Sequence, residues 1–186
     1  MFKRAAAAAI GFLLVAASPA WAGSAQCIHD GLPAAKRAEV DRLYDSSLRE
    51  GLDSRSYSPD ELLAALKTCG IERESAGFGP ALQAYAGYEF ETQAVRWFAR
   101  RQITPAQLDA AFARIPAAAV ARTRQLLSED SDDAQEALFD SADAFVRSLG
   151  LEPDQITVNW AMTYAYGRIV REEGERQVPG GLGRPV

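Results

Sequence analysis

The stretch from Ile156 to Arg171, ITVNWAMTYAYGRIVR, constrains the fold more than any other part of the chain. At 100° per residue, one side of this helix carries Ile156, Trp160, Thr163, Gly167 and Val170. Apolar residues continue around most of the circumference, and the sector suited to water holds Thr157, Tyr164, Arg168, Arg171 and Glu172. A helix that is apolar over most of its circumference is typically central, with other elements packed around it. We therefore predict a fold organised around this C-terminal helix.

Helix start and stop signals divide the rest of the chain. Ser58-Pro59-Asp60-Glu61 and Thr104-Pro105-Ala106-Gln107 have the pattern of a capping box with proline at the first helical position. Gly51, Gly70 and Gly150 are typical of helix ends. Together the signals predict seven helices, over about 33–50, 59–69, 80–101, 104–114, 116–127, 132–149 and 153–174. No segment favours a strand, so the expected fold is a single all-α globular domain.

The first 22 residues have the pattern of a signal peptide. Lys3 and Arg4 precede an apolar run from Ala5 to Ala17, and the segment ends in Ala20-Trp21-Ala22. A membrane anchor that stays on the protein is the alternative, although the apolar run is short for a span. We expect a signal peptide over 1–22, a helical domain over 23–174 and a flexible tail over 175–186. The predicted location is the periplasm or the exterior of the cell.

Both cysteines, Cys27 and Cys69, lie in the predicted mature chain. An even number of cysteines in an exported protein favours a disulfide. Closing a loop of 42 positions would stabilise the fold by about 4 kcal/mol in the chain-entropy model. Two unpaired, buried thiols are the alternative. His29, the only histidine, is expected to be a solvated residue beside Cys27.

Charge and motifs exclude several classes of function. Without Lys3 and Arg4 the formal charge changes from −5 to −7, which disfavours nucleic acid and anionic membrane surfaces as partners. A catalytic triad or a histidine-based metal site would have to use the single His29, and no phosphate-binding glycine motif is present. We therefore expect no cofactor, no metal and no stable membrane insertion once the signal peptide is removed.

Glu89 falls on the broad apolar side of its predicted helix, between Tyr85 and Gln93. A carboxylate in that position must be paired, hydrogen-bonded or protonated. It could act as an acid with a raised pKa. The structural interpretation is an ion pair with Arg96, Arg168 or Arg171, or a position at the edge of the apolar face.

The segment Ile71-Glu72-Arg73-Glu74-Ser75-Ala76-Gly77-Phe78-Gly79-Pro80 resembles the Glu-Ser segment of lytic transglycosylases, and the stretch 161–170, AMTYAYGRIV, resembles their Ala-Tyr-Asn-Ala-Gly segment. The resemblance implies a peptidoglycan-cleaving enzyme with Glu74 as general acid/base and Tyr164 in the second motif. Three features depart from the family: an extra residue lies between Ser75 and Phe78, the Gly-Leu-Met-Gln segment is missing, and no asparagine stands near Tyr164.

The missing catalytic residues and the acidic charge favour an exported helical protein that acts by binding. The expected partner is another envelope or extracellular protein, and an inhibitor or immunity protein is one form of this hypothesis. The transglycosylase-like enzyme is the alternative. A third interpretation, a carrier of a small apolar ligand, predicts a cavity lined by Trp97, Trp160 and neighbouring tyrosines.

Overall fold

The computed structural model describes residues 25–53, 57–129, 132–134 and 138–178. The predicted signal peptide and residues 179–186 of the predicted tail lie outside these ranges. The described residues form α1 (Ala25–Gly31), α2 (Ala34–Ser46), α3 (Leu48–Asp53), α4 (Pro59–Thr68), α5 (Phe78–Ala99), α6 (Pro105–Phe112), α7 (Ala117–Ser128), a 3₁₀ helix η1 (Asp132–Ala134), α8 (Phe139–Ser148) and α9 (Gln155–Gln177). The prediction of an all-α fold is confirmed.

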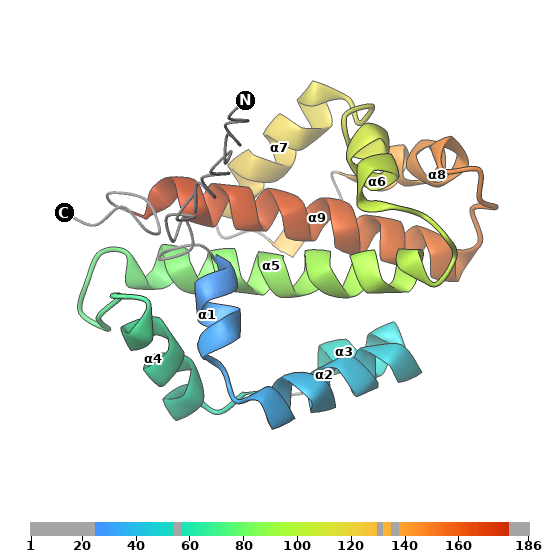
Figure 1. The fold of residues 1–186 in the computed structure, drawn as a ribbon. Coiled ribbons are helices and arrows are strands. Elements are labelled where there is room, and N and C mark those ends of the chain that lie inside the picture. Colours follow the sequence, from blue (N-terminus) through green and yellow to red (C-terminus); the bar gives the residue numbers. More distant parts are fainter. Residues whose placement is uncertain (1–24, 54–56, 130–131, 135–137, 179–186) are drawn as a thin grey trace, which may run out of the picture.

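Two long helices, α5 and α9, run side by side through the middle of the molecule (Figure 1). They are antiparallel, because Gly174 of α9 lies against Ala84 while Gly167 lies against Glu91, further along α5. Glycines allow their backbones to approach closely. A Cβ atom built on Gly87 would come within 2.2 Å of the backbone nitrogen of Arg171. A Cβ atom on Gly167 would come within 2.7 Å of the backbone nitrogen of Glu91. The predicted central helix is therefore one half of a central pair.

The remaining helices cover the pair from two sides (Figure 1). The main apolar core lies between α5, α9, α2 and the helices α6 to α8, and it includes Val40, Phe98, Leu108, Val146, Trp160 and Ile169. A smaller cluster joins α1, α4 and the first half of α5, and it includes Ile28, Leu66, Ile71 and Tyr85. Helices α1 to α4 therefore form an arm that packs along α5.

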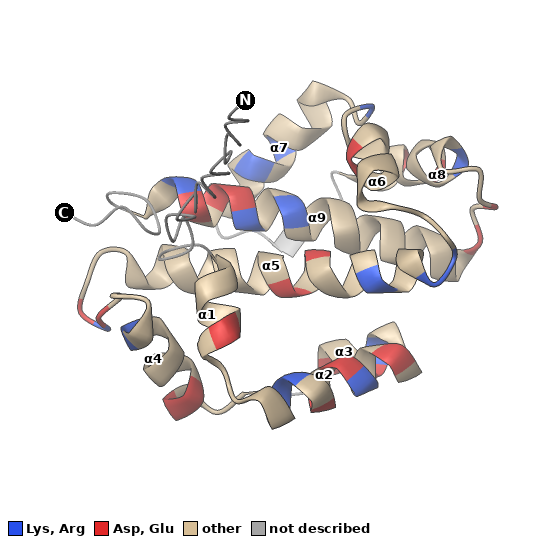
Figure 2. Ribbon diagram, in the orientation of Figure 1, with Lys and Arg blue, Asp and Glu red and all other residues tan. Residues whose placement is uncertain are grey.

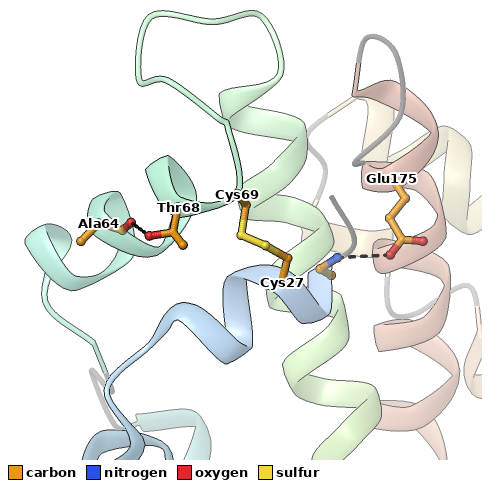
Figure 3. The surroundings of a disulfide bond; sticks show 6 residues. Cys27, Ala64, Thr68, Cys69 and Glu175 are labelled. Carbon is orange, nitrogen blue, oxygen red and sulfur yellow. Dashed lines mark hydrogen bonds between the residues drawn. A yellow bond between two sulfur atoms is a disulfide. The ribbon is translucent and has the colours of Figure 1, made fainter. Parts of the chain in front are cut away.

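The predicted disulfide is confirmed and closes the arm (Figure 3). Cys27 of α1 bonds to Cys69, the residue that caps α4, across a sequence separation of 42. A further contact links α1 to the central pair, because the Ala25 backbone N–H donates to Glu175 Oε1 of α9 (3.5 Å). Among the described residues, no helix is long and apolar enough to span a membrane.

The predicted helix over 33–50 is two helices, which corrects the expected number. The Ser47 backbone is extended (φ −161°, ψ 152°), and its hydroxyl accepts from the Glu50 N–H (3.1 Å), so a second helix starts there. Gly51 was expected to end the helix but lies within α3. The ring of Tyr44 packs against it so closely that a Cβ atom would lie 2.3 Å from the ring.

Four further expectations are corrected. Residues 25–31, where no helix was predicted, form α1, and α8 begins at Phe139 rather than near Asp132. On α9 the predicted water-facing sector is wrong for Thr157 (6 % exposed) and for Tyr164 (2 % exposed), whose ring packs against Phe112 and Phe145 while its hydroxyl donates to Asp109 on α6 (3.1 Å). Ile156, predicted to be on the buried stripe, is 63 % exposed.

Candidate functional site

Glu89 lies on the face of α5 that the N-terminal arm covers, and it is 8 % exposed. The Tyr85 hydroxyl donates to its Oε2 (2.8 Å), and the Gln93 amide donates to its Oε1 (3.3 Å). The predicted pairing with an arginine is wrong, because the three candidate arginines pair with other carboxylates: Arg96 with Asp41 and Asp45, Arg168 with Asp109 and Glu172, and Arg171 with Glu91 and Glu175. Neutral hydrogen-bond donors thus hold this buried carboxylate.

A continuous polar ladder leads from Glu89 towards the end of α5. Gln93 also donates to Asp41 Oδ1 of α2 (2.8 Å). Arg96 pairs with Asp41 and donates to Asp45 Oδ2 (3.1 Å), and Arg100 donates to Asp45 Oδ1 (2.5 Å). The α5 members recur three or four residues apart, so they share one face of the helix. We call the set Glu89, Gln93, Asp41, Arg96, Asp45 and Arg100 the polar ladder.

Four buried side-chain atoms in the arm and on α5 have no hydrogen-bond partner among the described residues: His29 Nδ1, Arg37 Nε, Tyr57 Oη and Gln93 Oε1. They come from α1, α2, the segment before α4, and α5. Burial lowers the pKa of His29, and the negative charge of Glu89 opposes this shift. Burial, reinforced by Glu89, raises the pKa of Tyr57 to about 12. The expectation that His29 is solvated is wrong, because it is half-buried and packs against Tyr88 (5.4 Å between ring centroids).

The ladder ends at an open hollow of about 470 Å³, a volume in the range of small-ligand sites. It lies where the junction of α2 and α3 meets the end of α5 and the start of α9. Its lining residues are Tyr44, Asp45, Ser46, Ser47, Leu48, Trp97, Arg100, Arg101, Ile156, Asn159 and Trp160. We call this feature the terminal hollow. The predicted grouping of Trp97, Trp160 and a tyrosine is therefore present, although the lining is part apolar and part charged.

Stacked indole rings form one part of the terminal hollow. The rings of Trp97 and Trp160 lie 5.5 Å apart between centroids, at an angle of 18°. The guanidinium of Arg101 lies over the Trp97 ring, 3.3 Å from its centroid, and donates to the Trp97 carbonyl (3.3 Å). Burial and the adjacent charge of Arg100 lower the pKa of Arg101, while the negative charge of Asp154 opposes this shift. Trp97 and Trp160 are largely buried (6 % and 2 % exposed), so the exposed Arg101 puts a positive charge over the edge of this aromatic core.

The charges of the terminal hollow do not cancel. Asp45 already accepts from Arg96 and Arg100, while Arg101 forms no ion pair with any described carboxylate. Of the three charged lining residues, two are arginines, so the lining has a surplus of one positive charge within a chain of formal charge −5. Figure 2 shows basic residues at this end of α5.

The two residues of the transglycosylase resemblance lie apart. Glu74 is exposed in the connection before α5, whereas Tyr164 is buried against Asp109 and Arg168. The start of α5 packs against Gly174, and Tyr164 lies ten residues earlier on α9, about 15 Å along the helix axis. The structure thus does not bring Glu74 and Tyr164 together.

Comparisons with protein family models, curated protein sequences and solved structures found no match to this chain. The fold and the site define a class in physical terms: an all-α, disulfide-bonded protein with an open, positively charged aromatic hollow.

Proposed function

We propose that this chain is an exported, non-enzymatic binding protein that holds part of another envelope or extracellular protein in the terminal hollow. The observation that carries the proposal is the hollow itself, with its stacked Trp97 and Trp160 and a rim that includes Ile156. Aromatic and arginine side chains are the residue types most enriched where proteins bind one another tightly. The disulfide between Cys27 and Cys69 is consistent with an oxidising compartment.

The exposure of Ile156 supports the same interpretation. Among the described residues, the large hydrophobic side chains that are exposed are Leu52, Phe139 and Ile156, and Ile156 is the most exposed of them at 63 %. Ile156 borders the hollow, and Leu52 lies one helical turn after the lining residue Leu48. Apolar side chains gathered at one concave place indicate an interaction site more strongly than the same side chains scattered singly.

Site-specific photo-crosslinking tests the proposal in the cells that produce the chain. A photoreactive phenylalanine analogue replaces Ile156 in one variant and Phe139 in a matched control. Phe139 is also exposed and apolar (52 %), but it is not among the residues that line the hollow. We expect a discrete adduct from position 156 only. We also expect the purified partner to bind the unmodified protein and to bind Ile156→Ser at least tenfold more weakly.

Equal adducts at both positions, or no adduct at position 156, would contradict the proposal. The assignment to an exported protein has its own check. The N-terminal residue of the protein recovered outside the cytoplasm should be Gly23, which follows the predicted cleavage point.

A further inference from the structure

The terminal hollow combines one unpaired positive charge with an apolar wall. The Arg101 guanidinium lies over the Trp97 ring, 3.3 Å from its centroid, and carries five N–H donors. One of them donates to the Trp97 carbonyl, which leaves others for a ligand. A planar carboxylate matches this fork of donors in shape and charge.

The charge balance selects a monoanion. Asp45 also lines the hollow, and its two oxygens are held by Arg96 and Arg100. The lining itself has a surplus of one positive charge, which Asp154 nearby partly offsets, so a single carboxylate is the most that the hollow can neutralise and a dianionic phosphate would leave a negative charge beside Asp45. A bound carboxylate would also relieve the repulsion between Arg100 and Arg101.

The remaining lining selects an apolar group beside that carboxylate. Leu48, Ile156 and the paired indoles face the same hollow as Arg101. An internal aspartate or glutamate would bring a carboxylate without an apolar side chain. A C-terminal residue carries a carboxylate and its side chain on the same Cα atom, so it offers both groups within one small volume.

We propose that the terminal hollow binds the free C-terminus of a partner chain whose last side chain is apolar, with the carboxylate at Arg101 and the side chain against Leu48 and Ile156. This inference rests on the proposed function, because it names the part of the partner that the hollow holds. Capture of a C-terminal carboxylate is an established mode of peptide recognition, and here an arginine side chain supplies the donors that backbone N–H groups supply elsewhere.

Fluorescence anisotropy with labelled peptides tests the inference on the mature protein. The probes are uncharged hexapeptides that end in Phe, Leu or Val, each with a free C-terminal carboxylate or a C-terminal amide. We expect the carboxylate form of at least one peptide to bind about tenfold or more tightly than its amide, a ratio typical of one charge-assisted hydrogen-bonding group. Arg101→Gln should abolish that ratio, and Arg101→Lys should restore part of it.

Arg122→Gln is the matched control, since Arg122 is an exposed arginine on α7 outside the hollow. It should leave the ratio unchanged. If carboxylate and amide peptides bind equally and Ile156→Ser weakens both, the C-terminus inference is overturned while the proposed binding function stands. If no peptide binds although position 156 gives a specific adduct, the inference is likewise overturned. If N-acetylphenylalanine binds as tightly as the best peptide, the occupant is a small organic acid and the partner-chain assignment is wrong.

Discussion

Helix α5 has two faces that are built in opposite ways. Towards α9 it presents Gly87, against which the α9 backbone packs within van der Waals contact, and the nearby polar groups are paired, as Arg171 is with Glu91 (2.6 Å). Its face towards the N-terminal arm carries the α5 members of the polar ladder, and this interface holds four buried polar atoms without a hydrogen-bond partner among the described residues. The first interface has no room for rearrangement, whereas the second has unused hydrogen-bonding capacity and ends at the open hollow.

The tightly packed face of α5 stabilises the fold, and the proposed binding site lies beside the other face. The glycine-lined interface fixes α5 and α9 as one rigid unit, because close-packed backbones cannot separate gradually. The arm is held to that unit by apolar contacts at Val40 and Tyr44 and by the polar ladder. The hollow lies between the rigid pair and the arm, so its shape depends on how the ladder positions α2.

The largest expected effect comes from Gly87→Ala. A methyl group there would lie 2.2 Å from the Arg171 nitrogen and 2.5 Å from the Gly167 carbonyl oxygen, so the two helices must move apart. We expect a loss of about 3 kcal/mol in the free energy of unfolding, measured by urea denaturation. Gly79→Ala is the control on the same helix, since no atom lies within 4 Å of its added Cβ. It should be neutral or stabilise by up to about 1 kcal/mol through helix propensity.

Removing the carboxylate on the other face should cost less. Glu89→Ala leaves the buried Tyr85 hydroxyl without its acceptor, which we expect to cost about 2 kcal/mol. Glu89→Gln keeps an acceptor oxygen and removes the charge, and it should cost less than about 1 kcal/mol. Comparing the two variants by urea denaturation separates the hydrogen bond from the charge. An equal cost for both would show that the negative charge, rather than the acceptor, stabilises this face.

Local signals in the sequence were sufficient for much of the fold. The capping boxes at Ser58 and Thr104 are present as predicted, because cap and partner lie within four residues of each other. Ser47 and Glu50 have the same spacing and could have revealed the break between α2 and α3. The disulfide followed from the number of cysteines and the predicted compartment.

The candidate site could be predicted only in part, because its contacts join distant segments. The spacing of Asp41 and Asp45, and that of Gln93, Arg96 and Arg100, indicates one polar face on each helix. The spacing does not show that these two faces meet. For this reason Arg96 was predicted as a partner of Glu89, whereas it pairs with Asp41 and Asp45 of α2. Whether Arg101 has a carboxylate partner depends on which carboxylates Arg96 and Arg100 pair with. Tertiary packing alone decides that pairing.

The arm face should also be the more sensitive to pH. Burial, assisted by Arg37, lowers the pKa of His29, while Glu89, Asp30 and Asp41 oppose the shift. Because the folded pKa lies below the ordinary value of 6.5, the unfolded chain binds more protons just below that pH, and stability falls as the pH drops from 7 through 6.5. Urea denaturation at pH values from about 7.5 to about 5.5, roughly one unit on either side of the ordinary pKa of histidine, measures the slope of the free energy of unfolding against pH. His29→Gln should flatten it, and an unchanged slope would assign the effect to other groups.

The smallest expected effect is that of Glu74→Gln, outside both faces of α5. Glu74 is exposed, so its substitution should change the free energy of unfolding by less than about 0.5 kcal/mol. A general acid and the groups that assist it must act on one substrate within one cleft, and Tyr164 is buried about 15 Å further along the central pair. We therefore expect no release of soluble fragments when the mature protein or the variant is incubated with peptidoglycan. Release by the wild-type protein that Glu74→Gln abolishes would replace the binding function with the transglycosylase-like activity and would move the functional site to the connection before α5.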